Sequence, residues 1–369
     1  MPNRGGDNRI LSIWISAILF FCCGEPKIGG DWSTFRGDYL RTGVSDDPGP
    51  SDNPQIIWEL ALGSKSSSSP IATDGRLFIG HSKGIACANA YTGELLWEFE
   101  TVKKVFSTPT YHHGDVYFGS WDGRLYRLNG QTGKSIWEFK TAAAIDCSPV
   151  VTDKTVYAGN FRGMLYALDI DDGSVEWGFP VGNWIVASPA FDGNTLYFGS
   201  RDSTFYAVDA ENGQEIWSFE AGGDMSGSPA IAEDKIFLGC NNMKIFCLQK
   251  KSGEKIWEFD TEGAMFSSPA IYNGRLFCGS TDSTLYCLDI TTGGEIWSFR
   301  TDGIIYSSPA AGRGRVFFGS YDGYIYALKT KSGELIWKHS LGHSVTSSPL
   351  IYADMLIIAS DIGTVYAFR

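Results

Sequence analysis

The chain has 369 residues, of which 43% are hydrophobic and 20% charged, and it contains 44 glycines, 12 tryptophans and 8 cysteines. This composition supports a large buried core and excludes a disordered or fibrous protein. The formal net charge of -12 argues against a nucleic-acid partner, because contact with DNA or RNA phosphates needs a basic face.

Residues 1–23 have the features of an export signal. Two arginines precede an apolar run at residues 10–21, which is too short to span a bilayer comfortably and has the length of a signal-peptide core. Cys22 and Cys23 follow this run, and the segment resembles a bacterial lipoprotein signal in which one of the two is lipidated. Export without lipidation and a plain membrane anchor are the alternatives.

Residues 24–53 are predicted to form a lead-in and a linker. Residues 31–43 have the sequence DWSTFRGDYLRTG, and the VSDDPGPSDNP that follows is rich in Pro, Asp and Ser, as linkers are. We therefore expect the main domain to span residues 54–369.

This main domain is built from a repeat of 39 or 40 residues. One unit, residues 269–308, contains four short runs of β-branched and aromatic residues separated by Asn-Gly, Asp-Ser and Thr-Gly turns, which predicts a four-stranded antiparallel meander. A repeat of this length with four strands is typical of a propeller blade. One tryptophan recurs in each unit: Trp58, Trp97, Trp137, Trp177, Trp217, Trp257, Trp297 and Trp337.

The chain ends indicate how many blades there are. The last unit, residues 349–369, has three strands and no tryptophan strand, whereas residues 56–62 carry Trp58 on a strand with no partners of its own. Joining the two ends in one blade gives eight blades and leaves no open sheet edge. Seven blades with a loose end are the alternative.

The segment YALDIDDGSVEW closely resembles the tryptophan-docking motif of the pyrroloquinoline quinone (PQQ) propeller family, here with Ala167, Asp169, Gly173 and Trp177 as its members. The resemblance recurs in seven units and implies an all-β, eight-bladed propeller. Glycine supplies the positive φ of the turn and the indole packs against the neighbouring blade, so all eight tryptophans are interpreted as packing residues. Three cysteines occupy the alanine place of the motif as small buried groups: Cys87, Cys247 and Cys287.

The remaining cysteines and histidines give no sign of a metal site or a disulfide framework. No two cysteines of the propeller have the close, paired spacing of such a framework, so we expect no structural disulfide. The histidines lack metal-ligand spacing and are expected at the surface: His81, His112, His113, His339 and His343.

The lead-in indicates which members of the PQQ propeller family the chain resembles most. Its Trp, Phe-Arg-Gly and Arg-Thr-Gly elements resemble the lead-in of bacterial PQQ-repeat proteins of the outer-membrane assembly factor BamB type. This resemblance implies a non-catalytic, exported and monomeric propeller, periplasmic or anchored to the outer membrane, that acts as a binding or assembly scaffold with envelope protein partners.

Candidate site residues are those that vary between repeats, because the constant ones are needed for the fold. Variable positions lie just before the Ser-Pro pair of each unit. If the strand that follows this pair is the innermost strand of its blade, these positions surround one mouth of the central channel. A solvated rim without function is the plain alternative, and a carbohydrate or peptide sensor would use the same mouth. The candidates are Lys104, Phe106, Asp146, Trp184, Asp224, Phe266 and Tyr306.

A quinoprotein oxidoreductase that uses PQQ and Ca²⁺ is the other alternative. The family resemblance implies that such an enzyme stacks PQQ between a tryptophan and a ring formed by two adjacent cysteines, but the sole adjacent pair here lies in the export signal. Trp184 could be the stacking floor, with Asp146 or Asp224 as metal ligand or base. Since no spacing demands this, we assign no catalytic residue, no metal ligand and no cofactor.

Overall fold

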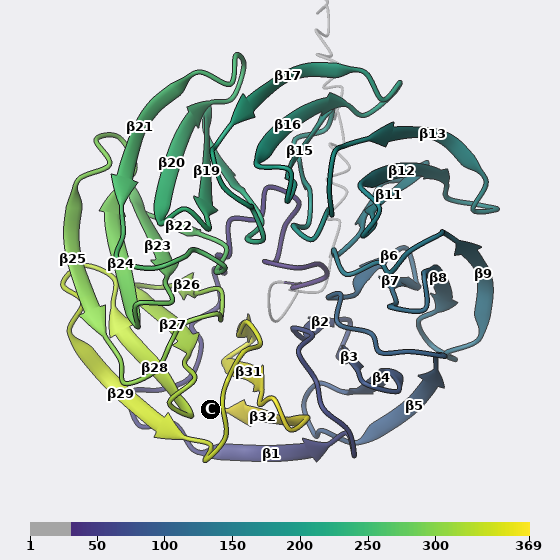
Figure 1. Ribbon diagram of the computed structural model, residues 1–369. Coiled ribbons are helices and arrows are strands. Elements are labelled where there is room, and N and C mark those ends of the chain that lie inside the picture. Colours follow the sequence, from purple (N-terminus) through teal and green to yellow (C-terminus); the bar gives the residue numbers. More distant parts are fainter. Residues whose placement is uncertain (1–30) are drawn as a thin grey trace, which may run out of the picture.

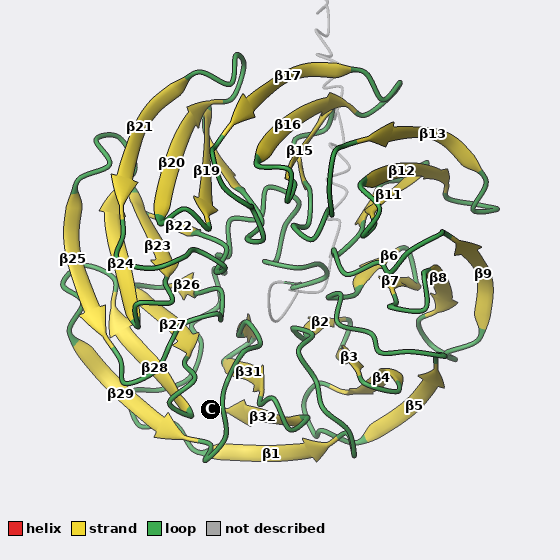
Figure 2. Cartoon of the chain, viewed as in Figure 1, coloured by secondary structure: helices red, strands yellow, loops and turns green. Residues whose placement is uncertain are grey.

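The structure is a computed structural model that describes residues 31–369, and within this range every regular element is a β-strand (Figure 2). The 32 strands form eight four-stranded antiparallel sheets, arranged as blades around a central axis (Figure 1). The predicted eight-bladed propeller is confirmed, and the alternative of seven blades with a loose end is wrong. The predicted export signal, with Cys22 and Cys23, lies outside the described residues.

Blades 1 to 7 each take four consecutive strands, running from the axis outwards. The innermost strands are β2 (Ile71–Thr73), β6 (Thr110–His112), β10 (Val150–Val151), β14 (Ala190–Phe191), β18 (Ala230–Ala232), β22 (Ala270–Tyr272), β26 (Ala310–Gly312) and, in blade 8, β30 (Leu350–Tyr352). The second strands are β3 (Arg76–His81), β7 (Asp115–Gly119), β11 (Thr155–Gly159), β15 (Thr195–Gly199), β19 (Lys235–Cys240), β23 (Arg275–Gly279), β27 (Arg315–Gly319) and β31 (Met355–Ala359).

The third strands are β4 (Gly84–Asn89), β8 (Arg124–Asn129), β12 (Met164–Asp169), β16 (Thr204–Asp209), β20 (Lys244–Gln249), β24 (Thr284–Asp289), β28 (Tyr324–Lys329) and β32 (Thr364–Phe368). The outermost strands are β5 (Leu95–Glu100), β9 (Ser135–Lys140), β13 (Val175–Pro180), β17 (Glu215–Glu220), β21 (Lys255–Asp260), β25 (Glu295–Arg300), β29 (Leu335–Ser340) and, in blade 8, β1 (Ile56–Ala61). Among residues 31–369, no helix has the length and apolarity needed to cross a bilayer.

Blade 8 closes the ring by pairing the two ends of the described chain. Strand β1 lies antiparallel to β32, with Trp58 opposite Ala367, and the N-H of Gln55 donates to the carbonyl of Arg369 at 2.9 Å. The missing fourth strand of the last repeat is therefore supplied from residues 56–61, as the sequence predicts.

The repeated tryptophans pack between blades in the predicted way. In six of them Nε1 donates to a backbone carbonyl 33 residues later, as Trp137 does to Ile170 at 2.9 Å and Trp217 to Lys250 at 3.2 Å. The Cα of each docking glycine packs closely against the indole of the preceding blade, and each of these glycines has a φ near +70°. A Cβ added to Gly253, for example, would lie 2.4 Å from Cε3 of Trp217. Glycine is therefore required there by both backbone conformation and space.

The six cysteines of the described chain are buried and unpaired. Cys87, Cys247 and Cys287 are fully buried and lie opposite the docking tryptophan on the neighbouring strand, where four other blades have alanine and blade 2 has Arg127. The interpretation of these three as small core residues is therefore confirmed.

The chain segment at residues 32–47, drawn in purple near the centre of the ring in Figure 1, crosses one end of the central channel. Its polar groups form hydrogen bonds to each blade in turn, either with the innermost strand or with the residue just after that strand. The sequence predicts a lead-in and linker here but not this course. The bonds join Trp32 to Ala72, Ser33 to Tyr111, Tyr39 to Val151 and Phe191, Leu40 to Ile231, Thr42 to Ile271, Gly43 to Ala311 and Asp47 to Ala353.

Two buried arginines fix this crossing segment. Arg41 donates from Nε to the carbonyl of Pro189 at 3.0 Å and from Nη1 to that of Phe35 at 2.7 Å, while Arg36 donates to the carbonyl of Pro269 at 3.0 Å. Burial lowers the pKa of Arg36 to about 9 and that of Arg41 to about 10. Both values lie above neutral pH, so the two guanidinium groups are charged, and they tie the segment to the residues that precede the innermost strands of blades 4 and 6.

Candidate binding site at the channel mouth

The propeller has two different faces. The turns between first and second strands, such as residues 112–115, lie on the side crossed by residues 32–47, which we call the lead-in face. The turns between second and third strands, such as residues 120–123, lie on the opposite side, which we call the mouth face. Strands alternate in direction, so the loop before each innermost strand also ends at the mouth face.

Four of the seven predicted site residues line one cavity on the axis: Phe106, Asp146, Phe266 and Tyr306. The cavity has a volume of about 160 Å³, and Phe35 of the crossing segment forms part of its lining. The rest of the lining is mostly serine, from the Ser-Pro step of each blade. The crossing segment therefore leaves a shallow axial pocket rather than an open tunnel.

Lys104 and Trp184 are not part of the cavity lining, but they belong to a row of side chains that begins at Phe106, which does line it. Nζ of Lys104 lies 3.4 Å from the ring centroid of Trp121 and 4.2 Å from that of Phe106. Trp121 contacts Phe161 edge to face, with centroids 5.4 Å apart.

The row continues into blade 4. Phe161 stacks on Trp184 with centroids 4.6 Å apart and planes within 3° of parallel, and Cζ of Arg201 lies 4.9 Å from the centroid of Trp184. Trp184 remains 40% exposed despite these contacts. We call this set the aromatic row: Lys104, Phe106, Trp121, Phe161, Trp184 and Arg201.

Asp146 joins the aromatic row to the axial cavity. Its Oδ1 accepts a hydrogen bond of 2.8 Å from Nε1 of Trp121. Burial raises the pKa of Asp146, while this hydrogen bond and the nearby charges of Lys104 and Arg201 act in the opposite direction. Asp146 thus orients the indole of Trp121 in the row.

The remaining predicted residues lie on the other side of the mouth. Phe266 and Tyr306 contact edge to face at 5.1 Å, and Tyr306 contacts Tyr321 at 5.3 Å. Asp224 lies in blade 5, between this group and the aromatic row in ring order, and its backbone carbonyl accepts from the N-H of Asn241 at 2.9 Å. The structure therefore places all seven predicted residues at one mouth, but in two groups with Asp224 outside both.

Four further residues, which the sequence did not indicate, complete these groups. They all lie two residues after the glycine that ends a second strand, at the turn of the mouth face. This position varies from repeat to repeat as much as the predicted ones do, so aligning the turns would have found it. The four are Trp121, Phe161, Arg201 and Tyr321.

The expectation that all five histidines lie at the surface is wrong for His81. Its side chain is buried, and Nδ1 lies 2.9 Å from Oγ of Ser64. The reason is its place in the repeat: other blades have a small buried residue at this point, as with Ser120 and Ser200. Burial accordingly lowers the pKa of His81.

The axial cavity does not fit PQQ, the cofactor that the family resemblance suggests. PQQ is a planar tricyclic quinone with three carboxylates, and pockets for ligands of drug size are about 300–1,000 Å³. The cavity here is about 160 Å³, and its lining includes one carboxylate and no lysine or arginine. Ca²⁺ takes 6–8 oxygen ligands, several of them usually carboxylates. Asp146 is the one carboxylate of the cavity lining, so the lining does not form such a ligand set. Within residues 31–369, moreover, no two cysteines are adjacent.

Comparison with known proteins gives the family. The family model described as "Outer membrane protein assembly factor BamB" matches residues 51–183, 122–264, 201–304 and 281–369. The chain belongs to the BamB family. No curated protein matches its sequence.

Several solved structures have a similar fold. BamB from Moraxella catarrhalis is 16% identical with a TM-score of 0.76, over 86% of this chain and 100% of that one. A europium-containing methanol dehydrogenase is 13% identical with a TM-score of 0.80, over 92% and 98%. The computationally designed protein Ika8 is 19% identical with a TM-score of 0.77, over 85% and 99%. An assembly factor, an enzyme and a designed protein share this fold, so the fold alone does not give the function.

Proposed function

We propose that this BamB-family chain is an exported, non-catalytic propeller that binds a protein partner at the cell envelope, through the aromatic row at its channel mouth, as an assembly scaffold. The family membership supports the envelope setting, and the small volume and serine lining of the axial cavity favour a binding role over catalysis. Membrane attachment through a lipid on Cys22 or Cys23 is part of the same proposal.

The observation that carries the proposal is the ordered, partly exposed Trp184. Protein-binding hot spots are enriched in Trp, Tyr and Arg held in well-packed surroundings. Trp184 stacks on Phe161 and also contacts the guanidinium of Arg201, so a partner would meet an indole that is already fixed. Little conformational entropy would be lost on binding.

The test captures partners from a detergent extract of the cell envelope on immobilised protein. Wild type is compared with Trp184→Ala and with Tyr91→Ala, which removes a 43% exposed aromatic side chain from the turn between β4 and β5 on the lead-in face. We expect the same partner on wild type and Tyr91→Ala, and at least a five-fold loss on Trp184→Ala, because a hot-spot truncation costs more than about 1 kcal/mol.

Two results would count against this function. Equal recovery on all three proteins would place the contact away from the mouth. Recovery of no specific partner, together with a rise in melting temperature on adding a sugar or short peptide that Trp184→Ala abolishes, would favour the sensor function instead.

A further inference from the structure

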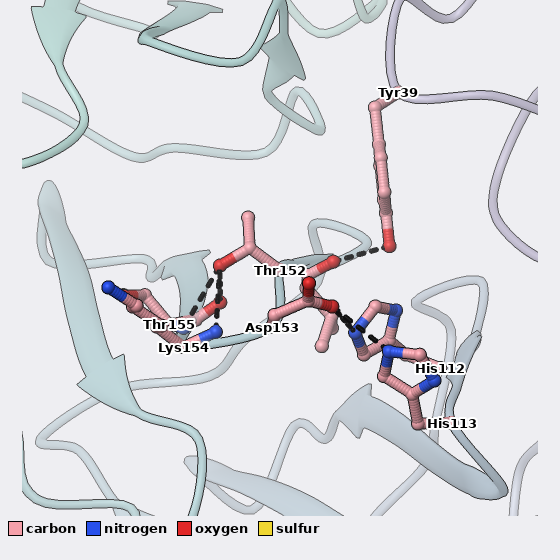
Figure 3. A network of polar contacts seen from close by, with 8 residues as sticks. Tyr39, His112, His113, Thr152, Asp153, Lys154 and Thr155 are labelled. Carbon is pink, nitrogen blue, oxygen red and sulfur yellow. Dashed lines mark hydrogen bonds and ion pairs between the residues drawn. The ribbon is translucent and has the colours of Figure 1, made fainter.

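Two histidines and an aspartate from neighbouring blades meet on the lead-in face, far from the mouth (Figure 3). His112 ends β6 and His113 follows it in the turn to β7, both in blade 2. Asp153 lies in the corresponding turn of blade 3, between β10 and β11. Because one repeat separates these turns in the sequence, they are neighbours in the ring.

Both imidazoles point at the same carboxylate oxygen. Nε2 of His112 lies 3.1 Å and Nε2 of His113 lies 3.0 Å from Oδ1 of Asp153. Ligand atoms about 2.1 Å from a tetrahedral zinc ion lie about 3.4 Å from one another. Both nitrogen–oxygen distances are therefore close to the spacing that one ion would impose, and all three ligand atoms lie within 4.8 Å of one another.

The segments that carry these groups are fixed by their own hydrogen bonds. The turn at Asp153 is closed by the N-H of Thr155, which donates to Oγ1 of Thr152 at 3.0 Å, and the hydroxyl of Tyr39 donates to the carbonyl of Val151 at 2.6 Å (Figure 3). Tyr39 thereby holds the end of β10 to the crossing segment.

The histidine turn is also fixed. His112 is paired with Asp115 in the β6–β7 hairpin, and its side chain is only 18% exposed. His113 has a φ of 47°. Histidine and asparagine are among the few residues other than glycine that adopt this region. Such fixed surroundings reduce the cost of assembling a ligand set.

We propose that His112, His113 and Asp153 bind a divalent transition-metal ion of the Zn²⁺ class, which would join blade 2 to blade 3. Two imidazole nitrogens and one carboxylate oxygen are a ligand set that zinc takes in proteins, whereas Ca²⁺ and Mg²⁺ prefer oxygen ligands throughout. The two imidazoles would bind through Nε2 with their protons on Nδ1. Since His113 and Asp153 are 75% and 80% exposed, the fourth position would be open to water.

The site is independent of the function proposed for the mouth. It lies on the other face and uses none of the residues of the aromatic row. The six cysteines of residues 31–369 are all buried, so they do not offer a competing thiolate at the surface.

The test titrates the full chain, carrying no histidine tag, with Zn²⁺ against a competing zinc indicator. His113→Asn keeps a residue that tolerates the turn, and Asp153→Asn keeps the shape of the carboxylate without its charge. His343→Asn, an exposed histidine on the mouth face, is the control. Removing a group that merely orients a metal ligand costs about 10- to 100-fold in affinity. We therefore expect at least a 10-fold loss in both variants and none in the control.

Thermal unfolding gives a second readout. Zn²⁺ should raise the melting temperature of wild type and of His343→Asn, because the ion binds only the assembled turns. It should not raise that of His113→Asn, and Mg²⁺ should change none of the proteins. Equal zinc binding in wild type, His113→Asn and Asp153→Asn would overturn the proposal, as would failure of wild type to compete with the indicator at all.

Discussion

The docking glycines allow the contact between blades to be measured against a matched control. Gly253 and Gly274 have almost the same φ, +73° and +72°, in the left-handed region. A Cβ on Gly253 would lie 2.4 Å from Cε3 of Trp217, whereas a Cβ on Gly274 would have nothing within 4 Å. Comparing Gly253→Ala with Gly274→Ala therefore separates the indole contact from backbone strain.

The two substitutions should differ by the cost of the clash. Placing an L residue in the left-handed region costs about 1–2 kcal/mol, and both variants share this cost. Overpacking adds about 1–3 kcal/mol, and here only Gly253→Ala creates it. The indole cannot move away freely, because its Nε1 is bonded to the carbonyl of Lys250. We expect losses of about 1–2 kcal/mol for Gly274→Ala and about 2–5 kcal/mol for Gly253→Ala.

The assay is thermal unfolding followed by calorimetry. At about 2 °C per kcal/mol for a protein of this size, the melting temperature should fall by roughly 2–4 °C for Gly274→Ala and by roughly 4–10 °C for Gly253→Ala. Equal decreases for the two variants would refute the account, because they would show that the glycine is needed only for its backbone conformation.

Three further predictions concern the same structure. Trp217→Phe should cost about 1 kcal/mol more in urea unfolding than Trp58→Phe, because Nε1 of Trp217 is hydrogen-bonded and that of Trp58 has no partner among the described residues. Arg41→Lys should speed limited proteolysis within residues 31–55, since lysine cannot reproduce the forked contacts to two carbonyls. Trp121→Phe should raise the pKa of Asp146 further in a carboxyl NMR titration, because it removes a hydrogen bond to the charged form.

The repeat made the fold predictable from the sequence. Each blade repeats the same turns and the same tryptophan, so eight repeats predict one local structure. A repeat that departs from the pattern therefore does not change the predicted fold. Even the pairing of β1 with β32 follows, because the last unit lacks one strand and residues 56–62 supply it. The positions that ring the mouth were predictable for the same reason.

The parts that the sequence did not reveal are those outside the repeat. Residues 32–47 have no periodicity, and their course depends on backbone bonds to strands spread over the whole ring. The meeting of His112, His113 and Asp153 depends on two turns one blade apart, which no local ligand spacing describes. The aromatic row was found only in part, because Trp121 and Phe161 lie in turns that the repeat pattern treats as loops.

The most direct test of the proposed function is site-specific photocrosslinking in cells that express the chain. A photoreactive amino acid replaces Val102, in the mouth-face loop that also carries Lys104, in one variant and Tyr91 on the lead-in face in another; the two side chains are 79% and 43% exposed, and Trp184 stays intact in both variants. We predict a crosslink to one envelope protein from position 102 and none from position 91. A crosslink from position 91 alone, or no protein crosslink from position 102, would contradict the assignment of the mouth as the surface that binds a partner.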